Sequence, residues 1–447
     1  MRQQAQYKGK FAHLLSILLL AAAPALAQDL PPPLDDDDFI AFDPAQAALG
    51  QLLFYDKILS GNRNISCGTC HHHDLGSSDG QSLGVGEGGT GIGRNRTAGV
   101  GADRIRHRVP RNAPALWNLG HRDVAFMFHD GRVSVSDIYG NGFNTPAEER
   151  LPQGLNSILA AQALFPMTSS AEMAGQPGEN EVAGAARDRA DLVWPILARR
   201  VRGIEAYGQG FVAAFDHIEE PGDVTIVEIV NAIAAFIGTE FRNHDSPFDK
   251  YLAGDSHALD PAQMRGMRLF YGDAGCSACH AGPLLSNQDF RALALPAFGP
   301  GRTRPFDPLP RDIGRVAETD DLDDAYRFRV PFLRNVALSP PYGHNGAMPT
   351  LQDMVRHHLD PLASNARWRP DMAILASAPW LDSGDFVIRE DRMETARRLA
   401  KIDIDLPPRT VSQIADIVAF LNALTGETAL QRPLGRPDRV PSGLPVD

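Results

Sequence analysis

Two short segments combine thiols and imidazoles at a spacing that could support chemistry. The first reads CGTCH from Cys67 to His71, and the second reads CSACH from Cys276 to His280. Cys-x-x-Cys-His is the attachment motif of c-type haem, in which the two sulfurs form thioethers with the porphyrin and the histidine becomes an axial ligand of the iron. The sequence therefore predicts two covalently bound haem c groups. Their predicted attachment residues are Cys67, Cys70, His71, Cys276, Cys279 and His280.

Other uses of these cysteines fit the pattern less well. A four-cysteine zinc site usually has its two pairs about 15–20 residues apart, whereas these pairs lie in different halves of the chain. A thioredoxin-like pair would need a preceding strand, and a plain disulfide would leave the repeated histidine unexplained. His72 and His73 follow the predicted ligand His71 directly. Because the turn of the chain displaces them from the iron, we expect both at the surface or near the haem propionates.

A further histidine pair, His357 and His358, lies in the stretch LQDMVRHHLD. Helical periodicity places His358 on an apolar face with Met354 and Val355, and His357 about 100° away on the polar face. We therefore expect His357 to face water and His358 to face the interior. An interior histidine is more often a core residue than a ligand. In a haem domain that needs a second axial ligand, however, it is the predicted partner of His280 on the iron.

The elements that must position these residues are themselves repeated. DPAQAALGQLLFY begins at Asp43 and DPAQMRGMRLFY begins at Asp260, and each predicts an aspartate N-cap with proline at the first helical position. Val224–Phe241 and Val411–Leu424 also have helical spacing, and alternating strand patterns are scarce. The glycine-rich stretch Gly76–Gly101 predicts a long loop beside the first haem motif. The predicted fold is mainly α, with two cytochrome c-like haem domains and long loops.

The N-terminus predicts export. A positive region, the short apolar run LLSILLLAAA and a small-x-small site ending at Ala27 are typical of a secretory signal peptide. We expect a periplasmic protein without a membrane span, since no later segment has the ~18 uninterrupted apolar residues of one. The formal net charge of −12 disfavours nucleic acid as a partner. The predicted boundaries are residues 1–27 for the signal peptide, 28–245 for the N-terminal domain, 246–430 for the C-terminal domain and 431–447 for a tail.

The haem motifs, the FHDGR stretch and the segment RFRVPFLRNVALSPPYGHNGAMPTL together resemble the bacterial dihaem cytochrome c peroxidase and MauG family. The resemblance runs over nearly the whole chain after the signal peptide. It implies that the N-terminal haem is the peroxidatic one, with His71 proximal and the other face open to hydrogen peroxide. It also implies a distal pocket with Glu172 as the acid/base and with Gln162 and Pro166 beside it. A carboxylate at an open haem face is suited to moving a proton.

The resemblance also implies roles for the second half. The C-terminal haem would transfer electrons, and His358 stands fourteen residues after His344, where relatives carry a methionine or tyrosine ligand. A calcium ion between the domains would be held by Asn112, Ser339 and Pro341, through the oxygen atoms that this hard cation prefers.

Two positions depart from the family pattern. His129 stands where relatives often have a tryptophan that relays electrons between the haems, and imidazole is much harder to oxidise than indole. Trp117 is a candidate substitute. The only histidine in the loop that blocks the peroxidatic iron of many resting relatives is His107, which is offset relative to Asn112. The pattern therefore does not predict such a block.

Three functions follow as hypotheses. The first is a peroxidase that reduces hydrogen peroxide with electrons from a small cytochrome c or cupredoxin, in some relatives as a homodimer. The second is a MauG-like enzyme that oxidises a side chain of a partner protein. The third is a dihaem electron carrier, which predicts six-coordinate iron at both haems and no reaction with peroxide. The predicted distal pocket favours the two enzymes over the carrier.

Overall fold

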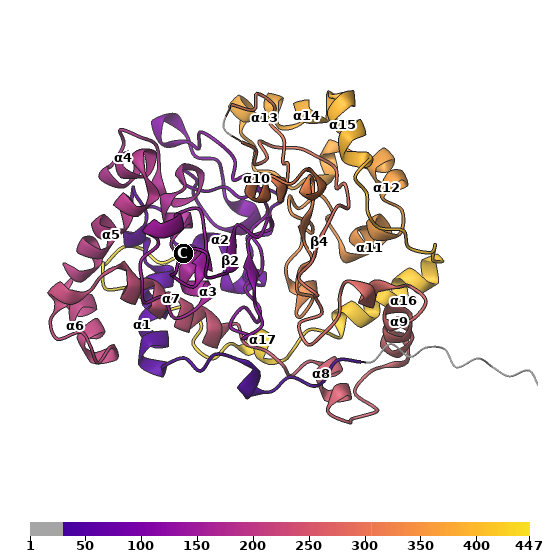
Figure 1. Ribbon diagram of the computed structural model, residues 1–447, viewed down its shortest axis with the longest axis horizontal. Helices are drawn as coiled ribbons and strands as arrows, with labels where there is room; N and C mark the ends of the chain where they lie inside the picture. Colours follow the sequence, from indigo (N-terminus) through magenta and orange to yellow (C-terminus); the bar gives the residue numbers. More distant parts are fainter. Residues whose placement is uncertain (1–29, 305) are drawn as a thin grey trace, which may run out of the picture.

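The structure is a computed structural model that describes residues 30–304 and 306–447. The predicted signal peptide, residues 1–27, lies outside the described residues. Figure 1 shows the N-terminal half, from indigo to magenta, beside the C-terminal half, in orange and yellow. The last segment of the chain returns to the N-terminal half, where the C-terminus lies (Figure 1).

Most of the regular structure is helical, which confirms the predicted fold class. The helices of the N-terminal half are α1 (Pro44–Tyr55), α2 (Cys67–Cys70), α3 (Ile158–Ala163), α4 (Glu181–Asp188), α5 (Val193–Arg202), α6 (Glu205–Ala214) and α7 (Ile226–Glu240). Those of the C-terminal half are α8 (Pro247–Leu252), α9 (Pro261–Tyr271), α10 (Val316–Thr319), α11 (Leu351–Leu359), α12 (Pro361–Arg367), α13 (Pro379–Asp385), α14 (Val387–Glu390), α15 (Arg392–Leu399), α16 (Val411–Asn422) and α17 (Thr428–Gln431).

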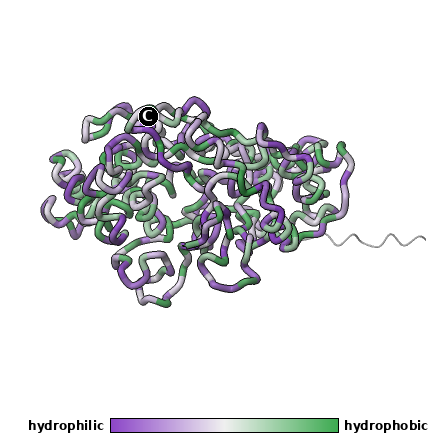
Figure 2. The backbone as a smooth tube through the Cα atoms, turned by 90° about the horizontal axis from the view of Figure 1, so that it is seen from above, coloured by the Kyte–Doolittle hydropathy of each residue, from purple (hydrophilic) through white to green (hydrophobic). Residues whose placement is uncertain are grey.

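The strands are short and antiparallel. One sheet has the order β1 (Phe126–Met127), β2 (Val133–Val135) and β3 (Phe143–Asn144), and the other pairs β4 (Phe290–Arg291) with β5 (Phe328–Arg329). No helix within the described ranges is long and apolar enough to cross a bilayer. Figure 2 shows hydrophobic stretches of the chain interrupted by hydrophilic ones.

The two copied segments form equivalent helices. The Asp43 carboxylate accepts hydrogen bonds from the amides of Ala45 and Gln46 at the start of α1, and Asp260 caps α9 in the same way. The predicted N-caps are therefore confirmed. An aspartate at this position satisfies amides that have no partner inside the helix and adds a negative charge at its positive end.

Each of these helices crosses a later helix at a glycine. A Cβ on Gly50 of α1 would lie 1.8 Å from the carbonyl oxygen of Ala232 in α7. A Cβ on Gly266 of α9 would lie 1.9 Å from the carbonyl oxygen of Asp416 in α16. Only glycine allows the two backbones to approach so closely. The same crossing therefore builds the core beside each haem motif.

The glycine-rich stretch is an ordered loop that packs beside the first haem motif. Arg96 is buried, and its guanidinium donates to the carbonyl oxygens of Val85 (2.6 Å), Gly86 (2.8 Å) and Gly91 (2.8 Å). A Cβ on Gly86 would lie 1.8 Å from the carbonyl oxygen of Ala171. The loop thus presses against the turn that carries Glu172.

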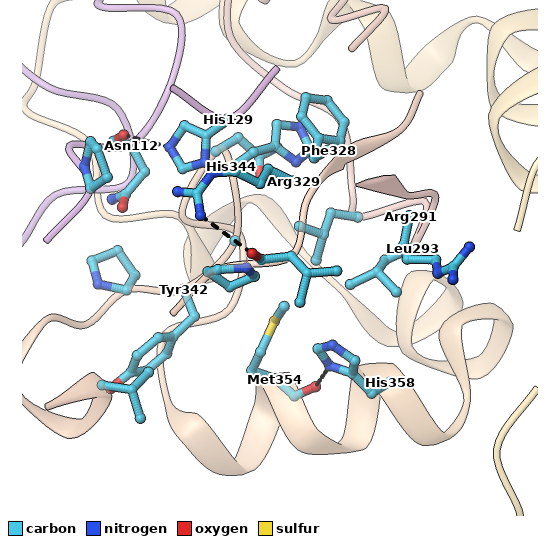
Figure 3. A pocket seen from close by; sticks show the side chains of 18 of the residues that line it. Asn112, His129, Arg291, Leu293, Phe328, Arg329, Tyr342, His344, Met354 and His358 are labelled. Atoms are coloured by element: carbon cyan, nitrogen blue, oxygen red, sulfur yellow. Dashed lines mark hydrogen bonds between the residues drawn. The ribbon is translucent and has the colours of Figure 1, made fainter. Parts of the chain in front are cut away.

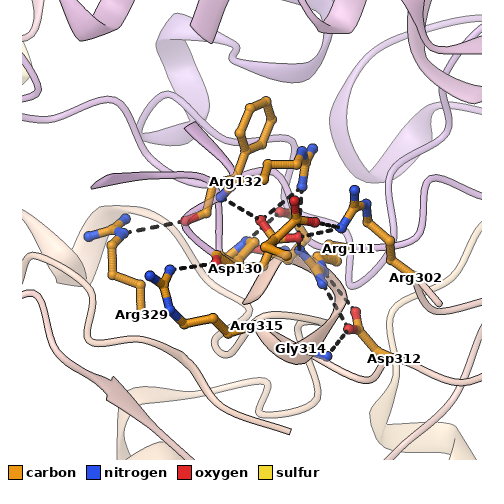
Figure 4. A network of polar contacts seen from close by, with 12 residues as sticks. Arg111, Asp130, Arg132, Arg302, Asp312, Gly314, Arg315 and Arg329 are labelled. Atoms are coloured by element: carbon orange, nitrogen blue, oxygen red, sulfur yellow. Dashed lines mark hydrogen bonds and ion pairs between the residues drawn. The ribbon is translucent and has the colours of Figure 1, made fainter. Parts of the chain in front are cut away.

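A network of charges joins the two halves (Figure 4). Asp130 is fully buried and accepts hydrogen bonds from Arg111 (2.6 Å) and from Arg302 (2.9 Å) of the C-terminal half. Arg111 also binds both carboxylate oxygens of Asp312, at 2.7 and 2.8 Å. Bidentate contacts of this kind fix the relative orientation of the groups that make them.

Candidate active site

The cysteines of the haem motifs are free thiols set into apolar surroundings. Cys67 and Cys70 lie at the two ends of α2, and burial raises the pKa of both thiols to about 12. Between them, a Cβ on Gly68 would lie 2.4 Å from the Tyr55 ring, so this turn requires glycine. Burial also raises the pKa of Cys276 to about 11. Neutral sulfurs in an apolar site fit the uncharged thioethers of haem c.

Hydrogen bonds orient the three predicted iron ligands alike. The Nδ1 atoms of His71 and His280 lie 3.0 Å from the carbonyl oxygens of Ser77 and Leu285. The Nδ1 atom of His358 lies 2.9 Å from the carbonyl oxygen of Met354. Because a carbonyl oxygen only accepts, each Nδ1 carries the proton and each Nε2 keeps the lone pair that an iron ligand needs.

His280 and His358 face each other across one cavity. Their ring centroids are 6.3 Å apart, and both line the cavity with the apolar side chains of Phe270, Met354 and Leu421. Figure 3 shows Met354 and His358 on the same helix, with the Nδ1 bond that fixes the His358 ring. This arrangement supports His358 as the second axial ligand predicted for the C-terminal haem.

The prediction that His357 faces water is wrong. Its side chain is fully buried, and its Nε2 donates to the carbonyl oxygen of Leu293 at 2.8 Å. The segment around Leu293 covers the side of α11 that the helical pattern marks as polar. Since its Nε2 is already used, His357 is not oriented as an iron ligand.

The two histidines after the first motif are structural side chains. His72 is 5% exposed, so the expectation of a surface position is wrong for this residue. Its Nδ1 accepts a hydrogen bond from the Asp74 amide at 3.2 Å, and its ring packs against that of His73 at a centroid distance of 4.5 Å. His73 is partly exposed and lies 3.2 Å from the Asp74 carboxylate. Both rings belong to the turn that follows the ligand.

Glu172 lies in η8 (Ser170–Ala174), a single π-helical turn. Burial raises the pKa of this carboxyl group, while Arg132 and a hydrogen bond from Ser169 oppose that shift. The charge of Glu172 also acts on the Cys70 thiol, so the carboxyl group is within electrostatic range of the first haem motif. The predicted acid is therefore half-buried near the first haem motif and is not an exposed helix-start residue.

Gln162 and Pro166 lie on the same run of turns as Glu172. Gln162 is in the last turn of α3, and Pro166 begins η7 (Pro166–Thr168). The carbonyl oxygen of Gln162 accepts from the Phe165 amide at 3.1 Å, and that of Pro166 accepts from the Ser169 amide at 3.2 Å. These bonds fix the backbone between the two residues and Glu172. Their roles in the pocket stay predictions.

The three residues predicted to hold calcium line the cavity between the halves: Asn112, Ser339 and Pro341. The Asn112 amide donates to the carbonyl oxygen of His344 at 2.8 Å, and its own carbonyl oxygen lies 3.0 Å from His129 Nε2. Its side-chain amide donates to the carbonyl oxygen of Gln81 at 2.7 Å. Calcium binding by these residues stays a prediction.

Trp117 and His129 both line this same cavity. Burial, reinforced by Arg111, lowers the pKa of His129 to about 4, so its imidazole is neutral. The Trp117 indole is 3% exposed and donates to the carbonyl oxygen of Gly76 at 3.1 Å, next to the residue that orients His71. Trp117 therefore lies between the two haem motifs. His107 is an exposed residue of the preceding loop.

Sequence reasoning missed two arginines. Arg132 lies 3.4 Å above the Phe128 ring and has the largest opposing charge effect on Glu172, and its place in FHDGR was the available signal. Arg329 projects into the cavity that His280 and His358 line (Figure 3). Arg329 lies in the segment RFRVPFLRN, but its lack of an acidic partner depends on the tertiary structure and cannot be read from the sequence.

The model of the di-haem cytochrome c peroxidase family matches residues 44–257. The cytochrome c551 peroxidase of Pseudomonas aeruginosa is 31% identical over 310 residues, which cover 69% of this chain and 70% of that protein. This chain belongs to the di-haem cytochrome c peroxidase family. Its free thiols and Nδ1-anchored histidines fit the haem c groups of that family.

The similar proteins include both cytochrome c peroxidases and MauG. The cytochrome c peroxidase Ccp of Escherichia coli is 32% identical over 315 residues, which cover 70% of this chain but only 53% of that protein. MauG of Methylorubrum extorquens is 27% identical over 318 residues, covering 71% of this chain and 69% of that protein. A solved MauG-like protein associated with microbial copper homeostasis is 26% identical, with a TM-score of 0.58 over 92% of this chain and 98% of its own.

Proposed function

We propose that this chain is a periplasmic dihaem peroxidase that reduces hydrogen peroxide to water with electrons from a small redox protein. The observation that carries the proposal is Glu172, a half-buried carboxyl group near the first haem motif whose pKa is raised by desolvation. An electron carrier has no use for such a group, because it moves no proton to or from a substrate.

Each residue of the first site has a separate role in this reaction. Haem c at Cys67 and Cys70 would supply an iron that binds and reduces peroxide when its distal face is open. The carbonyl oxygen of Ser77 orients the imidazole of His71, which would hold the iron. Glu172 takes the proton from one peroxide oxygen and returns it to the other, which leaves as water. Two electrons and two protons in total convert one peroxide to two water molecules.

Arg132 affects the pH range in which the Glu172 carboxyl group can both accept and donate a proton. Burial alone would keep Glu172 protonated, and the Arg132 guanidinium partly restores its ionised form. A proton shuttle needs both forms to be accessible at the working pH, since it must accept a proton and then donate it. The opposing effects on Glu172 meet that need.

The second site would bring electrons in. His280 and His358 would hold the iron of the second haem through two imidazoles, an arrangement that suits electron transfer. Trp117 and His129 lie in the wall between this cavity and the first motif. Of the two, Trp117 has the more easily oxidised ring.

A second candidate is oxidation of a side chain on a partner protein. It is favoured by His129, which replaces the tryptophan of the peroxidases, and by the similarity to MauG of Methylorubrum extorquens. This enzyme would use the same two haem sites and the same Glu172.

Electron paramagnetic resonance of the ferric protein, before and after stoichiometric hydrogen peroxide, tests these functions. A high-spin haem beside a low-spin haem, with rapid peroxide turnover when a reduced cytochrome c is added, is expected for the peroxidase. A long-lived oxidised state that small reduced cytochromes do not discharge would favour the second candidate. Two low-spin haems that stay inert to peroxide, even after one is reduced, would leave only the electron carrier.

A further inference from the structure

Arg329 is a half-buried arginine of the cavity wall, and no counter-charge among the described residues pairs with it. Burial lowers its pKa to about 10, and no acidic group of the described chain offsets that shift. Its Nε and Nη1 atoms donate to the carbonyl oxygens of Phe128 at 3.4 Å and Val330 at 3.3 Å. Both bonds are long for N–H···O contacts, so they compensate the charge poorly.

The other arginines of this cavity are better compensated. Arg291 pairs with Asp289 (3.2 Å), Arg311 with Asp307 and Glu394 (2.8 Å each), and Arg334 with Asp249. Arg398 has no carboxylate partner among the described residues, but one of its nitrogens donates to the carbonyl oxygens of Ala294 and Leu295. Among these arginines, Arg329 is therefore the one that has neither a carboxylate partner nor a short hydrogen bond.

We infer that Arg329 binds a propionate carboxylate of the haem attached at Cys276 and Cys279. A buried cation without a partner is costly, and an anion in the cavity would remove that cost. The cavity that Arg329 lines is the one that holds His280 and His358, and haem c carries two carboxylates into it. A guanidinium binds a carboxylate through two parallel hydrogen bonds, and no carboxylate of the described residues pairs with Arg329.

The position of Arg329 gives this contact a further role. Its backbone amide donates to the carbonyl oxygen of His129 at 2.8 Å, and its side chain reaches Phe128 (Figures 3 and 4). A propionate bound here would therefore lie against the segment Phe128–Asp130 of the other half. Arg329 would couple the charge of the second haem to the wall that faces the first.

The inference rests on the haem attachment that the proposed function includes, and not on peroxide turnover. Its first test is the midpoint potential of the bis-histidine haem, measured by optical spectroelectrochemistry on the full dihaem protein. Removing a positive charge beside the haem favours the ferric form. We expect Arg329→Gln to lower the ferrous-to-ferric ratio at fixed potential roughly tenfold, which is about 59 mV for a one-electron couple.

Two variants separate this contact from a general loss of charge. Arg329→Lys keeps the cation and is expected to shift the ratio less than threefold. Arg311→Gln removes an arginine from the same cavity, but one that is already paired with Asp307 and Glu394, and is expected to shift the ratio less than twofold. An unchanged potential in Arg329→Gln, or an equal shift in Arg311→Gln, would overturn the inference.

The wild-type protein gives an independent answer if Arg329→Gln does not load its second haem. A propionate paired with Arg329 stays ionised, so at most one of the two propionates of that haem should titrate between about pH 5 and pH 8. A pH dependence of the potential that requires both propionates to titrate in this range would contradict the pairing. Peroxidase activity is measured separately, so its absence would refute the proposed function and leave this result unaffected.

Discussion

Glu172 lies where burial opposes the ionisation of its carboxyl group and two guanidinium groups favour it. Arg132 is the larger of these opposing charges and Arg302 the smaller. The turn itself is fixed by three amides that converge on the Ser169 carbonyl oxygen, at 2.9 to 3.2 Å. Single π-helical turns of this kind occur often at functional sites.

Replacing Glu172 by glutamine should abolish its proton transfer while keeping its shape. We expect Glu172→Gln to lower kcat/KM for hydrogen peroxide by about 10²–10⁴, the usual range for losing a general acid–base. The optical spectra of both ferric haems should not change. Steady-state peroxide kinetics with a reduced cytochrome c make the measurement.

Glu149→Gln is the matched control, since Glu149 is an exposed surface residue of the same half. It should leave kcat/KM within twofold of the wild type. A Glu172→Gln enzyme as active as this control would remove Glu172 from the mechanism.

At the residue scale, the sequence predicts what a local motif determines and fails where the tertiary structure decides. The roles of His71 and His280 follow from their position directly after the second cysteine of each haem attachment motif. Their hydrogen bonds agree with those roles. The helix face of His357 also followed correctly from periodicity. Its burial did not, because Leu293 comes from a distant segment that covers the polar side of α11.

At the element scale, the two glycine crossings are the clearest product of the repeat. Both Gly50 and Gly266 stand at the same place in the copied segment, and both bring a helix backbone against a carbonyl oxygen. The repeat does not predict that α7 and α16 are the partner helices. The apolar spacing of the sequence predicts that these two helices exist, but their contacts with α1 and α9 depend on long-range packing.

A single methyl group should be enough to disturb these crossings. We expect Gly50→Ala and Gly266→Ala each to lower the free energy of unfolding by about 1–3 kcal/mol, since the added Cβ must push a backbone away. Gly184→Ala in α4 is the matched control, because no atom lies within 4 Å of its added Cβ. It should stabilise the protein by about 0.5–1 kcal/mol. Urea unfolding, monitored by circular dichroism, measures whether each variant is less or more stable than the wild type.

The glycine-rich loop depends on one side chain for its order. Arg96→Gln removes the three guanidinium bonds to the loop, each worth about 1 kcal/mol. We expect amide hydrogen exchange at Gly86–Gly91 to become about 10–100-fold faster, because each 1.4 kcal/mol of local stability is about tenfold in opening. Mass spectrometry of hydrogen exchange measures this.

Arg94→Gln tests whether the effect is specific, since Arg94 is exposed on the same loop. Amide hydrogen exchange at Gly86–Gly91 in Arg94→Gln should be as slow as in the wild type. Equal exchange in Arg96→Gln and Arg94→Gln would show that other contacts order the loop.

At the scale of the whole molecule, the two halves are joined by charges as well as by the cavity wall. Asp130 is the centre of this network, with Arg111 and Arg132 on its own half and Arg302 across the interface. These guanidinium groups hold the pKa of the Asp130 carboxyl group far below its usual range, against the opposing effect of burial. The network could not be predicted, because FHDGR shows the charges but not the arginine that arrives from the other half.

The depressed pKa of Asp130 gives the acid stability of the protein a definite sign. A carboxyl group whose pKa is lower in the folded state than in the unfolded state stabilises the fold above its unfolded pKa of about 4, and this contribution is lost progressively as the pH falls below that value. The wild-type protein should therefore lose stability steeply between about pH 4 and pH 2. Asp130→Asn should flatten this part of the pH profile, because the titrating group is gone.

The same variant should be less stable at neutral pH. Asp130→Asn leaves Arg111, Arg132 and Arg302 without their shared carboxylate, and breaking a buried ion pair in this way costs about 3–5 kcal/mol. Asp137→Asn, at an exposed position of the same half, is the control and should follow the wild type at every pH. Urea midpoints measured from pH 2 to pH 8 on the three proteins compare the profiles. A parallel downward shift of the whole Asp130→Asn profile, with the acid slope unchanged, would mean that other carboxylates set the acid stability and that Asp130 only fixes how the two halves meet.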